Sequence, residues 1–299
     1  MLELNQQEIT TPPRPAATVV LLRDAPAGLE AFLVRRHGAS DVLGGAHVFP
    51  GGKVDPADAS ADALGRLDVP AESLRHALHE PALAATDAAA FFFAACRETF
   101  EESGVLLGRH PDGVPADAAT AGRAAALARE GVSFVGILER LDLVLDCTGL
   151  SPWSRWITPR VPAMMSKRFD TRFFIVTLPA GQQALHDDHE ADDSTWLAPR
   201  EALSRYWNRE ISLAPPQIMS LAHLARFARV ADALAEARGR RPPLIEPASF
   251  EHEGTRAIAY PGDPRHGVAE RAWPGPSRVV FRQGRFEPLS GGFDAFFSD

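Results

Sequence analysis

The stretch that decides the fold is Arg97-Glu98-Thr99-Phe100-Glu101-Glu102-Ser103-Gly104, or RETFEESG in one-letter code. At ~100° per residue, its three glutamates fall at about 0°, 300° and 40° around a helix, which is a single stripe. Like charges at this spacing repel one another, so the stripe calls for a compensating cation. Gly104 is a typical helix end. The segment therefore predicts a helix that presents an acidic face to a metal ion.

The opposite face of the same helix is apolar. Phe92, Cys96 and Phe100 recur at i, i+4 and i+8, so one side is expected to pack while the other side binds. A solvated acidic face is the usual explanation for a pair of neighbouring glutamates. Five fixed residues (Arg, Glu, Glu, Glu and Gly), however, coincide by chance only about once in 10⁶ positions. The spacing thus favours a functional site.

A glycine-containing segment further upstream, 47–55 (HVFPGGKVD), completes a known pattern. Together the two segments resemble the box of the Nudix hydrolases, in which a glycine, five residues and a glutamate precede the Arg-Glu-apolar-any-Glu-Glu-any-Gly run. Two departures from that box are visible. Asp58 stands where the family has glutamate and is one methylene shorter. An insertion of 31 residues also lengthens the spacer between Asp58 and Arg97.

The insertion is itself predicted to be helical, over about 59–87, because it is rich in good helix formers and is broken by Pro81. A box split in this way resembles the Nudix branch that contains the peroxisomal-type coenzyme A diphosphatases. Two further stretches, 156–159 (WITP) and 168–174 (RFDTRFF), add to this resemblance. The likeness extends over roughly residues 15 to 235.

The pattern of residues predicts alternating strands and helices. Strands are expected at 18–22 and 30–36 as a hairpin, at 47–49 and at 172–178, and helices at 116–130, 134–141 and 213–238. The resemblance implies an α/β fold, namely a Nudix α/β/α sandwich with a mixed sheet. We expect a Nudix domain at 1–239, with its box at 51–105, and a C-terminal extension with short strands at 240–299. This extension is expected either to fold over the core or to contact a second copy in a homodimer.

The resemblance also implies the chemistry of the acidic stripe. Glu98, Glu101, Glu102 and the carbonyl of Gly51 are expected to hold Mg²⁺ or Mn²⁺, since hard oxygen ligands suit these ions. Arg97 is expected to orient Glu98 by a charge-assisted hydrogen bond. Catalysis is assigned to Glu98, as the favoured general base, with Arg97 and Glu102. Glu190, in a later acidic segment, is the alternative base.

Substrate recognition is assigned to four arginines near predicted strand ends: Arg35, Arg36, Arg168 and Arg172. A guanidinium can clamp a phosphate with two hydrogen bonds, although a single arginine is more often a plain surface charge. Trp153 and Trp156 could stack on a base or close the core, and the sequence leaves both roles open.

Three hypotheses of function follow. The first is metal-dependent hydrolysis of the diphosphate bond of coenzyme A or acyl-CoA, giving 3′,5′-ADP and (acyl-)phosphopantetheine. The second keeps this chemistry but takes ADP-ribose, a dinucleotide or a nucleotide sugar as substrate. The third is a non-catalytic ligand-sensing Nudix domain, which the presence of all three box glutamates disfavours.

Composition agrees with a soluble enzyme of 299 residues. A net charge of −8 argues against binding to nucleic acid or to an anionic membrane. The two cysteines, Cys96 and Cys147, show no pairing signal, and no apolar run approaches the ~20 residues of a membrane span. The N-terminal residues lack the plan of a signal peptide, and the final residues 297–299 differ from a Ser-Lys-Leu address. We therefore expect a cytoplasmic protein that binds a small nucleoside diphosphate derivative.

Overall fold

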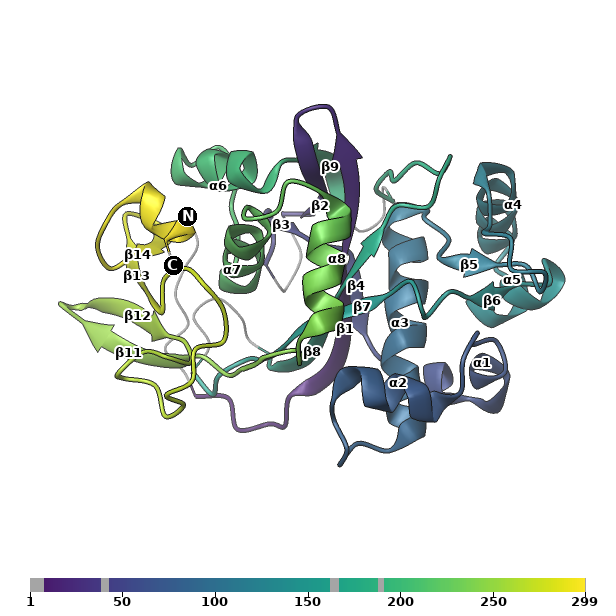
Figure 1. The fold of residues 1–299 in the computed structure, drawn as a ribbon, viewed down its shortest axis with the longest axis horizontal. Coiled ribbons are helices and arrows are strands. Elements are labelled where there is room, and N and C mark those ends of the chain that lie inside the picture. Colours follow the sequence, from purple (N-terminus) through teal and green to yellow (C-terminus); the bar gives the residue numbers. More distant parts are fainter. Residues whose placement is uncertain (1–7, 39–42, 162–166, 188–190, 299) are drawn as a thin grey trace.

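The computed structural model describes residues 8–38, 43–161, 167–187 and 191–298. Its centre is an eight-stranded mixed sheet (Figure 1). The strand order is β10 (Leu244–Ile245), β7 (Ser151–Ile157), β8 (Phe169–Thr177), β1 (Arg14–Ala25), β2 (Gly28–Arg36) and β3 (His47–Val48). In addition, β4 (Gly51–Lys53) pairs with β1, and β9 (Ala191–Leu197) pairs with β2. Because β1 runs parallel to β8 and antiparallel to β2, the predicted mixed sheet and the predicted hairpin are both confirmed.

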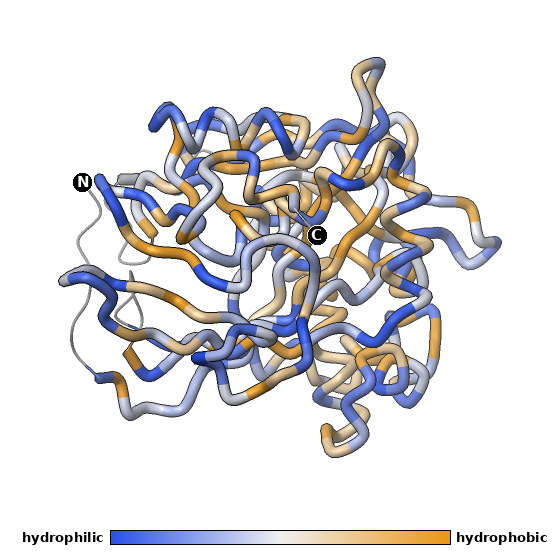
Figure 2. Tube along the Cα trace, turned by 60° about the vertical axis from the view of Figure 1, so that its left-hand side comes forward, coloured by the Kyte–Doolittle hydropathy of each residue, from blue (hydrophilic) through white to orange (hydrophobic). Residues whose placement is uncertain are grey.

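The alternation of side chains along β1 divides the interior into two hydrophobic cores. Val19 and Leu21 face one core, whereas Val20 and Leu22 face the other. The first core lies under α1 (Ala61–Leu64), α2 (Ala71–Leu78), α3 (Ala85–Ser103), α4 (Ala118–Arg129) and α5 (Phe134–Arg140). The second lies under α6 (Pro199–Trp207), α7 (Pro215–Leu224) and α8 (Val230–Gly239). Hydrophobic stretches run through this interior, while many protruding loops are hydrophilic (Figure 2). The predicted α/β/α sandwich is therefore confirmed.

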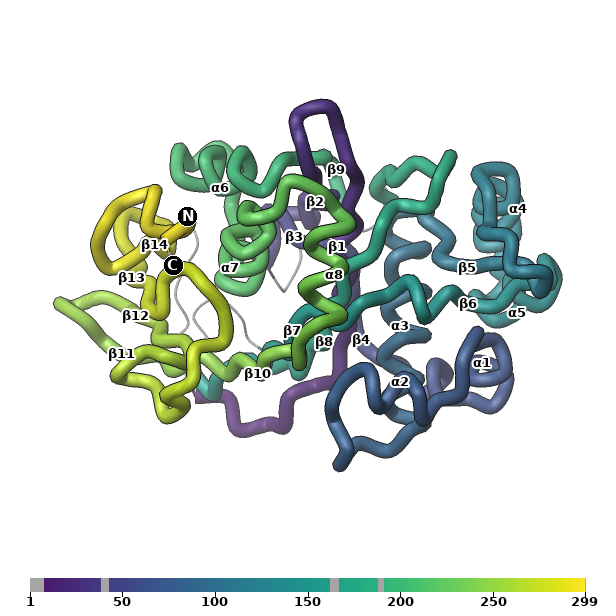
Figure 3. Tube along the Cα trace, viewed as in Figure 1, coloured from purple at the N-terminus to yellow at the C-terminus, as the bar shows by residue number. Residues whose placement is uncertain are grey.

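The short helix η1 (Pro56–Ala59) carries Asp58 and leads into the insertion, which forms α1 and α2 beside α3 (Figure 3). The helical character of the insertion is confirmed. A small ribbon of β5 (Gly108–Arg109) and β6 (Val144–Leu145) follows α3. Where the insertion returns toward α3, the carboxylate of Glu80 accepts hydrogen bonds from Arg155 at 2.8 Å and from Arg172 at 2.5 and 3.0 Å. This ion-pair cluster ties the insertion to the sheet.

The C-terminal residues form a second sheet of four antiparallel strands: β11 (Ala248–His252), β12 (Thr255–Ala259), β13 (Arg278–Arg282) and β14 (Arg285–Pro288). A final short helix, η2, covers Phe293–Phe297. This sheet packs on the second core. The ring of Tyr260 lies against that of Trp156, with centroids 5.9 Å apart, and the hydroxyl of Tyr206 donates to the carbonyl of Phe286 at 2.9 Å. The extension therefore folds over the core, while the domain boundary at 239/240 and the homodimer stay predictions.

The predicted helix over 213–238 is wrong, because the structure divides it into α7 and α8. The intervening segment lets Phe227 reach the second core, where its ring meets that of Trp153 at 6.5 Å. The first turn of α8 is then capped from a distant part of the chain, since the carboxylate of Asp24 accepts a hydrogen bond from the amide of Val230 at 2.8 Å. A tertiary contact thus overrides the continuous helical pattern.

Both cysteines are buried free thiols. Within the described ranges, the structure holds no helix of the length and apolarity that a membrane crossing requires.

We expect Glu80→Gln to destabilise the protein, because Arg172 is only 3% exposed and loses its charged partner on the insertion. Loss of charge-assisted hydrogen bonds should lower the free energy of unfolding by about 2 kcal/mol, measured by urea denaturation. Glu72→Gln, which removes an exposed ion pair of the same insertion with Arg75, is the matched control and should have a much smaller effect. Equal losses for both variants would contradict the anchoring role of Glu80.

Candidate active site

Helix α3 carries the acidic stripe and is held rigidly by its other face. Phe92, Cys96 and Phe100 are at most 5% exposed, as the sequence predicts. Phe92 packs on Phe174 of β8, with ring centroids 4.7 Å apart. The helix ends at Gly104, whose φ of 68° is left-handed and whose amide donates to the carbonyl of Phe100. The position of each acid relative to the sheet is therefore fixed by packing.

Strand β4 brings two glycines against the acidic face. Gly51 has a φ of 153°, and a Cβ there would lie 2.3 Å from the carbonyl oxygen of Ala17. At Gly52 a Cβ would lie 2.5 Å from the carboxyl carbon of Glu98. The amide of Gly51 also donates to the carboxylate of Glu102 at 2.9 Å. Only glycines allow this close approach of β4 to the acids.

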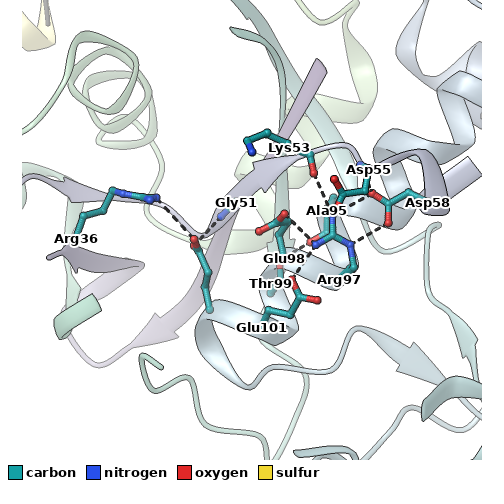
Figure 4. A network of polar contacts seen from close by, with 11 residues as sticks. Arg36, Gly51, Lys53, Asp55, Asp58, Ala95, Arg97, Glu98, Thr99 and Glu101 are labelled. Atoms are coloured by element: carbon teal, nitrogen blue, oxygen red, sulfur yellow. Dashed lines mark hydrogen bonds and ion pairs between the residues drawn. The ribbon is translucent and has the colours of Figure 1, made fainter. Parts of the chain in front are cut away.

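The guanidinium of Arg97 organises the acids around it (Figure 4). Its Nε and Nη2 donate to the two carboxylate oxygens of Asp58 at 2.9 and 3.0 Å. Its Nη1 donates to Glu98 at 2.9 Å and to Glu101 at 2.8 Å, and Nη2 also donates to the carbonyl of Lys53 at 3.0 Å. The predicted contact between Arg97 and Glu98 is present. Asp58 is 1% exposed and reaches Arg97 with both oxygens despite its shorter side chain.

The charges around Arg97 fix its protonation. Burial lowers the pKa of Arg97, but the hydrogen bond to Asp58 and the charges of Glu98 and Asp58 raise it more, so its pKa lies above the usual value. Arg97 therefore stays a cation and forms ion pairs with Glu98 and Asp58.

A cleft of about 450 Å³ opens beside these residues. Glu98 and Glu102 line it together with the glycines of β4 and the side chains of Arg36 and Lys53. Glu101 does not line the cleft and instead pairs with Arg97 at the surface, where its side chain is 49% exposed. The structure thus brings Glu98, Glu102 and Gly51 together and leaves Glu101 outside.

The donors in the cleft suit a hard divalent cation. Carboxylate and carbonyl oxygens are the ligands that Mg²⁺ and Mn²⁺ prefer. Across the described ranges, no three His, Cys, Asp or Glu side chains converge in a metal-binding arrangement. The acids instead pair with arginines: Arg97 forms ion pairs with Glu98 and Glu101, and Nη1 of Arg36 lies 3.8 Å from Glu102. Glu98 and Glu102 fit a cation as a pair, while the assignment of Glu101 stays a prediction.

The four arginines assigned to substrate binding lie in different surroundings. Arg36 lines the cleft, and its buried Nε has no hydrogen-bond partner among the described residues. Arg35 pairs with Asp192 on β9, which raises the pKa of Arg35. Arg168 is 8% exposed and donates to the carbonyl of Thr158, and Arg172 binds Glu80. Of the four arginines, only Arg36 lies beside the acids of the cleft. A substrate-binding role for the other three stays a prediction, and their positions in the structure do not support it.

Glu190, the alternative base, lies outside the described residues. The described residues before this gap run beside the end of α3, because the amide of Asp187 donates to the backbone carbonyl of Glu102 at 3.2 Å and that of Leu185 to Ser103 at 3.1 Å. Its role stays a prediction.

Lys53 is a residue of the cleft that the sequence argument did not single out. It lines the cleft beside the glycines, and its carbonyl receives a hydrogen bond from Arg97. The sequence did contain an indication of this position, because Lys53 directly follows Gly51 and Gly52. A cation next to these glycines lies near the acids that the glycine strand approaches.

A mixed sheet between two helical layers, with a glycine strand facing a glutamate helix, defines a Nudix hydrolase. Residues 11–224 match the family described as NUDT19 Nudix domain. The chain therefore belongs to the Nudix hydrolase family and is a Nudix-type diphosphatase.

Individual relatives agree with this family. The chain is 33% identical to "Acyl-coenzyme A diphosphatase NUDT19" of Gallus gallus, with 73% of this chain and 70% of the relative covered. It is 34% identical to the protein of the same name from Homo sapiens, with 73% and 67% covered. A solved NUDIX hydrolase from Alicyclobacillus acidocaldarius has a TM-score of 0.61 and 28% identity over 76% of this chain and 97% of its own.

We expect Gly52→Ala to lower kcat at least about tenfold, because the new methyl group displaces the Glu98 carboxylate. The rate of diphosphate hydrolysis measures this effect. Gly122→Ala in α4, where an added Cβ meets nothing within 4 Å, is the control and should keep the normal rate. Unchanged activity of Gly52→Ala would show that Glu98 need not occupy this position.

Proposed function

We propose that the protein hydrolyses the diphosphate bond of coenzyme A or acyl-CoA with Mg²⁺ or Mn²⁺, giving 3′,5′-ADP and (acyl-)phosphopantetheine. The observation that carries this proposal is the cleft in which Glu98 and Glu102 face a glycine strand and two cations. The curated relatives named acyl-coenzyme A diphosphatase support the choice of substrate. The cytoplasmic location stays a prediction.

The chain's own residues have distinct tasks in this reaction. A divalent cation on Glu98 and Glu102 would neutralise phosphoryl charge and make the attacking water more acidic. The water attacks one phosphorus atom, the bridging P–O bond breaks, and each half leaves as a phosphate monoester. Glu98, which Arg97 holds by a hydrogen bond, is the proposed acceptor of the proton that the water loses. Arg36 and Lys53 would balance the charge of the diphosphate.

Product analysis tests the substrate. Incubation with coenzyme A and Mg²⁺ should release 3′,5′-ADP and phosphopantetheine, identified by mass spectrometry, and EDTA should stop the reaction. ADP-ribose, a dinucleotide and a nucleotide sugar are assayed in parallel at equal concentration. A clear preference for one of these would replace coenzyme A as the substrate, and tight binding without hydrolysis would favour a ligand sensor.

We expect Glu102→Gln to lower kcat for coenzyme A at least about 100-fold while the protein remains folded, because the change removes an anionic ligand from the cleft. Thermal unfolding verifies the fold. Glu101→Gln should lose less, since Glu101 lies outside the cleft, and Glu130→Gln, exposed at the end of α4, should lose nothing. If Glu101→Gln and Glu102→Gln were equally inactive, Glu101 would have to enter the site during catalysis.

A further inference from the structure

The cleft has two ends of different chemistry. The charged end holds Glu98, Glu102 and Asp55 together with the cations Arg36 and Lys53. The other end is apolar and is built from three parts of the chain: Trp156 and Phe173 of the sheet, Pro215 and Pro216 at the start of α7, and Pro247 and Ile258 of the C-terminal extension. Figure 1 shows β11 and β12 lying across from α3, on the far side of the sheet strands. If a diphosphate diester binds with its phosphates at the charged end, one of its two substituents (arms) can therefore extend into the apolar end.

The distribution of cations limits which arm this is. Arg36 and Lys53 are the only cations among the described residues that line the cleft, and both lie beside the acids, at Glu102 and next to Gly52. All lysines and arginines of the chain belong to the described ranges. Taking a phosphate out of water without a cation is strongly unfavourable. The apolar end is therefore unsuited to a nucleoside that carries an additional phosphate.

The polar atoms at the apolar end suit an uncharged ligand. Oε1 of Gln217, Nε1 of Trp156 and Oγ of Ser249 have no hydrogen-bond partner in the described part of the chain. Gln217 and Trp156 are only 6% and 4% exposed. The three atoms comprise an acceptor, a donor and a hydroxyl that can do both. The C=O and N–H of an amide ligand could form hydrogen bonds with these atoms. Such bonds would remove the free-energy cost of leaving buried polar groups unpaired.

We propose that the apolar end, with one wall supplied by the C-terminal extension, binds the uncharged amide-bearing arm of the substrate. The phosphorylated nucleoside arm then lies on the side of Arg36 and Lys53. This inference rests on the proposed function, because coenzyme A joins two such arms: a pantetheine with two amides, and an adenosine with a 3′-phosphate. In this arrangement the indole of Trp156 donates to an amide carbonyl and the side chain of Gln217 accepts from an amide N–H, while Ser249 of β11 lines the same cleft.

The Ser249→Trp variant tests the proposal by filling the apolar end from β11, an edge strand of its sheet. Dissociation constants of 4′-phosphopantetheine and of 3′,5′-ADP are measured separately by ligand-observed NMR titration with Mg²⁺ present. We expect the affinity for 4′-phosphopantetheine to fall at least tenfold and that for 3′,5′-ADP to change less than twofold. Ser290→Trp, on the same extension but away from the cleft, is the matched control and should change neither.

Gln217→Leu is the second variant, because it removes the buried amide while keeping its volume. It should weaken 4′-phosphopantetheine three- to tenfold and leave 3′,5′-ADP unchanged. Loss of 3′,5′-ADP affinity instead, or no change for either ligand in both variants, would overturn the inference even though the wild-type protein hydrolyses coenzyme A. If the wild-type protein does not hydrolyse coenzyme A, the proposed function itself fails, so the two failures are distinguishable.

Discussion

The geometry of the site depends on the guanidinium of Arg97. This one group binds Asp58 with two hydrogen bonds, holds Glu98 and Glu101, and reaches the carbonyl of Lys53. It thereby joins the glycine segment to the glutamate helix, although the insertion separates them in sequence. A planar guanidinium has enough donors for this, whereas the ammonium group of lysine does not match the fork geometry of a carboxylate. The side chain of Arg97 thus connects the two halves of the interrupted box in the folded protein.

The insertion is compatible with the site because it is anchored at both ends. Asp58 holds its start through Arg97, and Glu80 holds its return through Arg155 and Arg172. Lengthening a surface loop costs little entropy as long as its ends stay close together. The arginines that would otherwise be available for phosphate therefore serve the scaffold, and Arg36 is left as the guanidinium in the cleft.

The C-terminal extension changes what kind of cleft the Nudix core offers. Its sheet packs on the second core and contributes an apolar wall opposite the acids. In the proposed function, the charged end that the core supplies carries out the cleavage. The apolar wall from the extension is proposed to bind the other arm of the substrate. Under this proposal, catalysis and selectivity belong to different parts of the chain.

The sequence by itself determined the helix α3, its acidic and apolar faces and its end at Gly104, since these depend on spacing within a few residues. The family followed from the resemblance of two short motifs, 47–55 and 97–104, to a known box. The sequence also predicted the central hairpin and the sandwich. Only the tertiary structure decided that Glu102 enters the cleft while Glu101 pairs with Arg97. It likewise decided that Asp24 caps α8 and that Arg172 binds Glu80. These contacts join residues far apart in the chain, and local patterns carry no information about such distances.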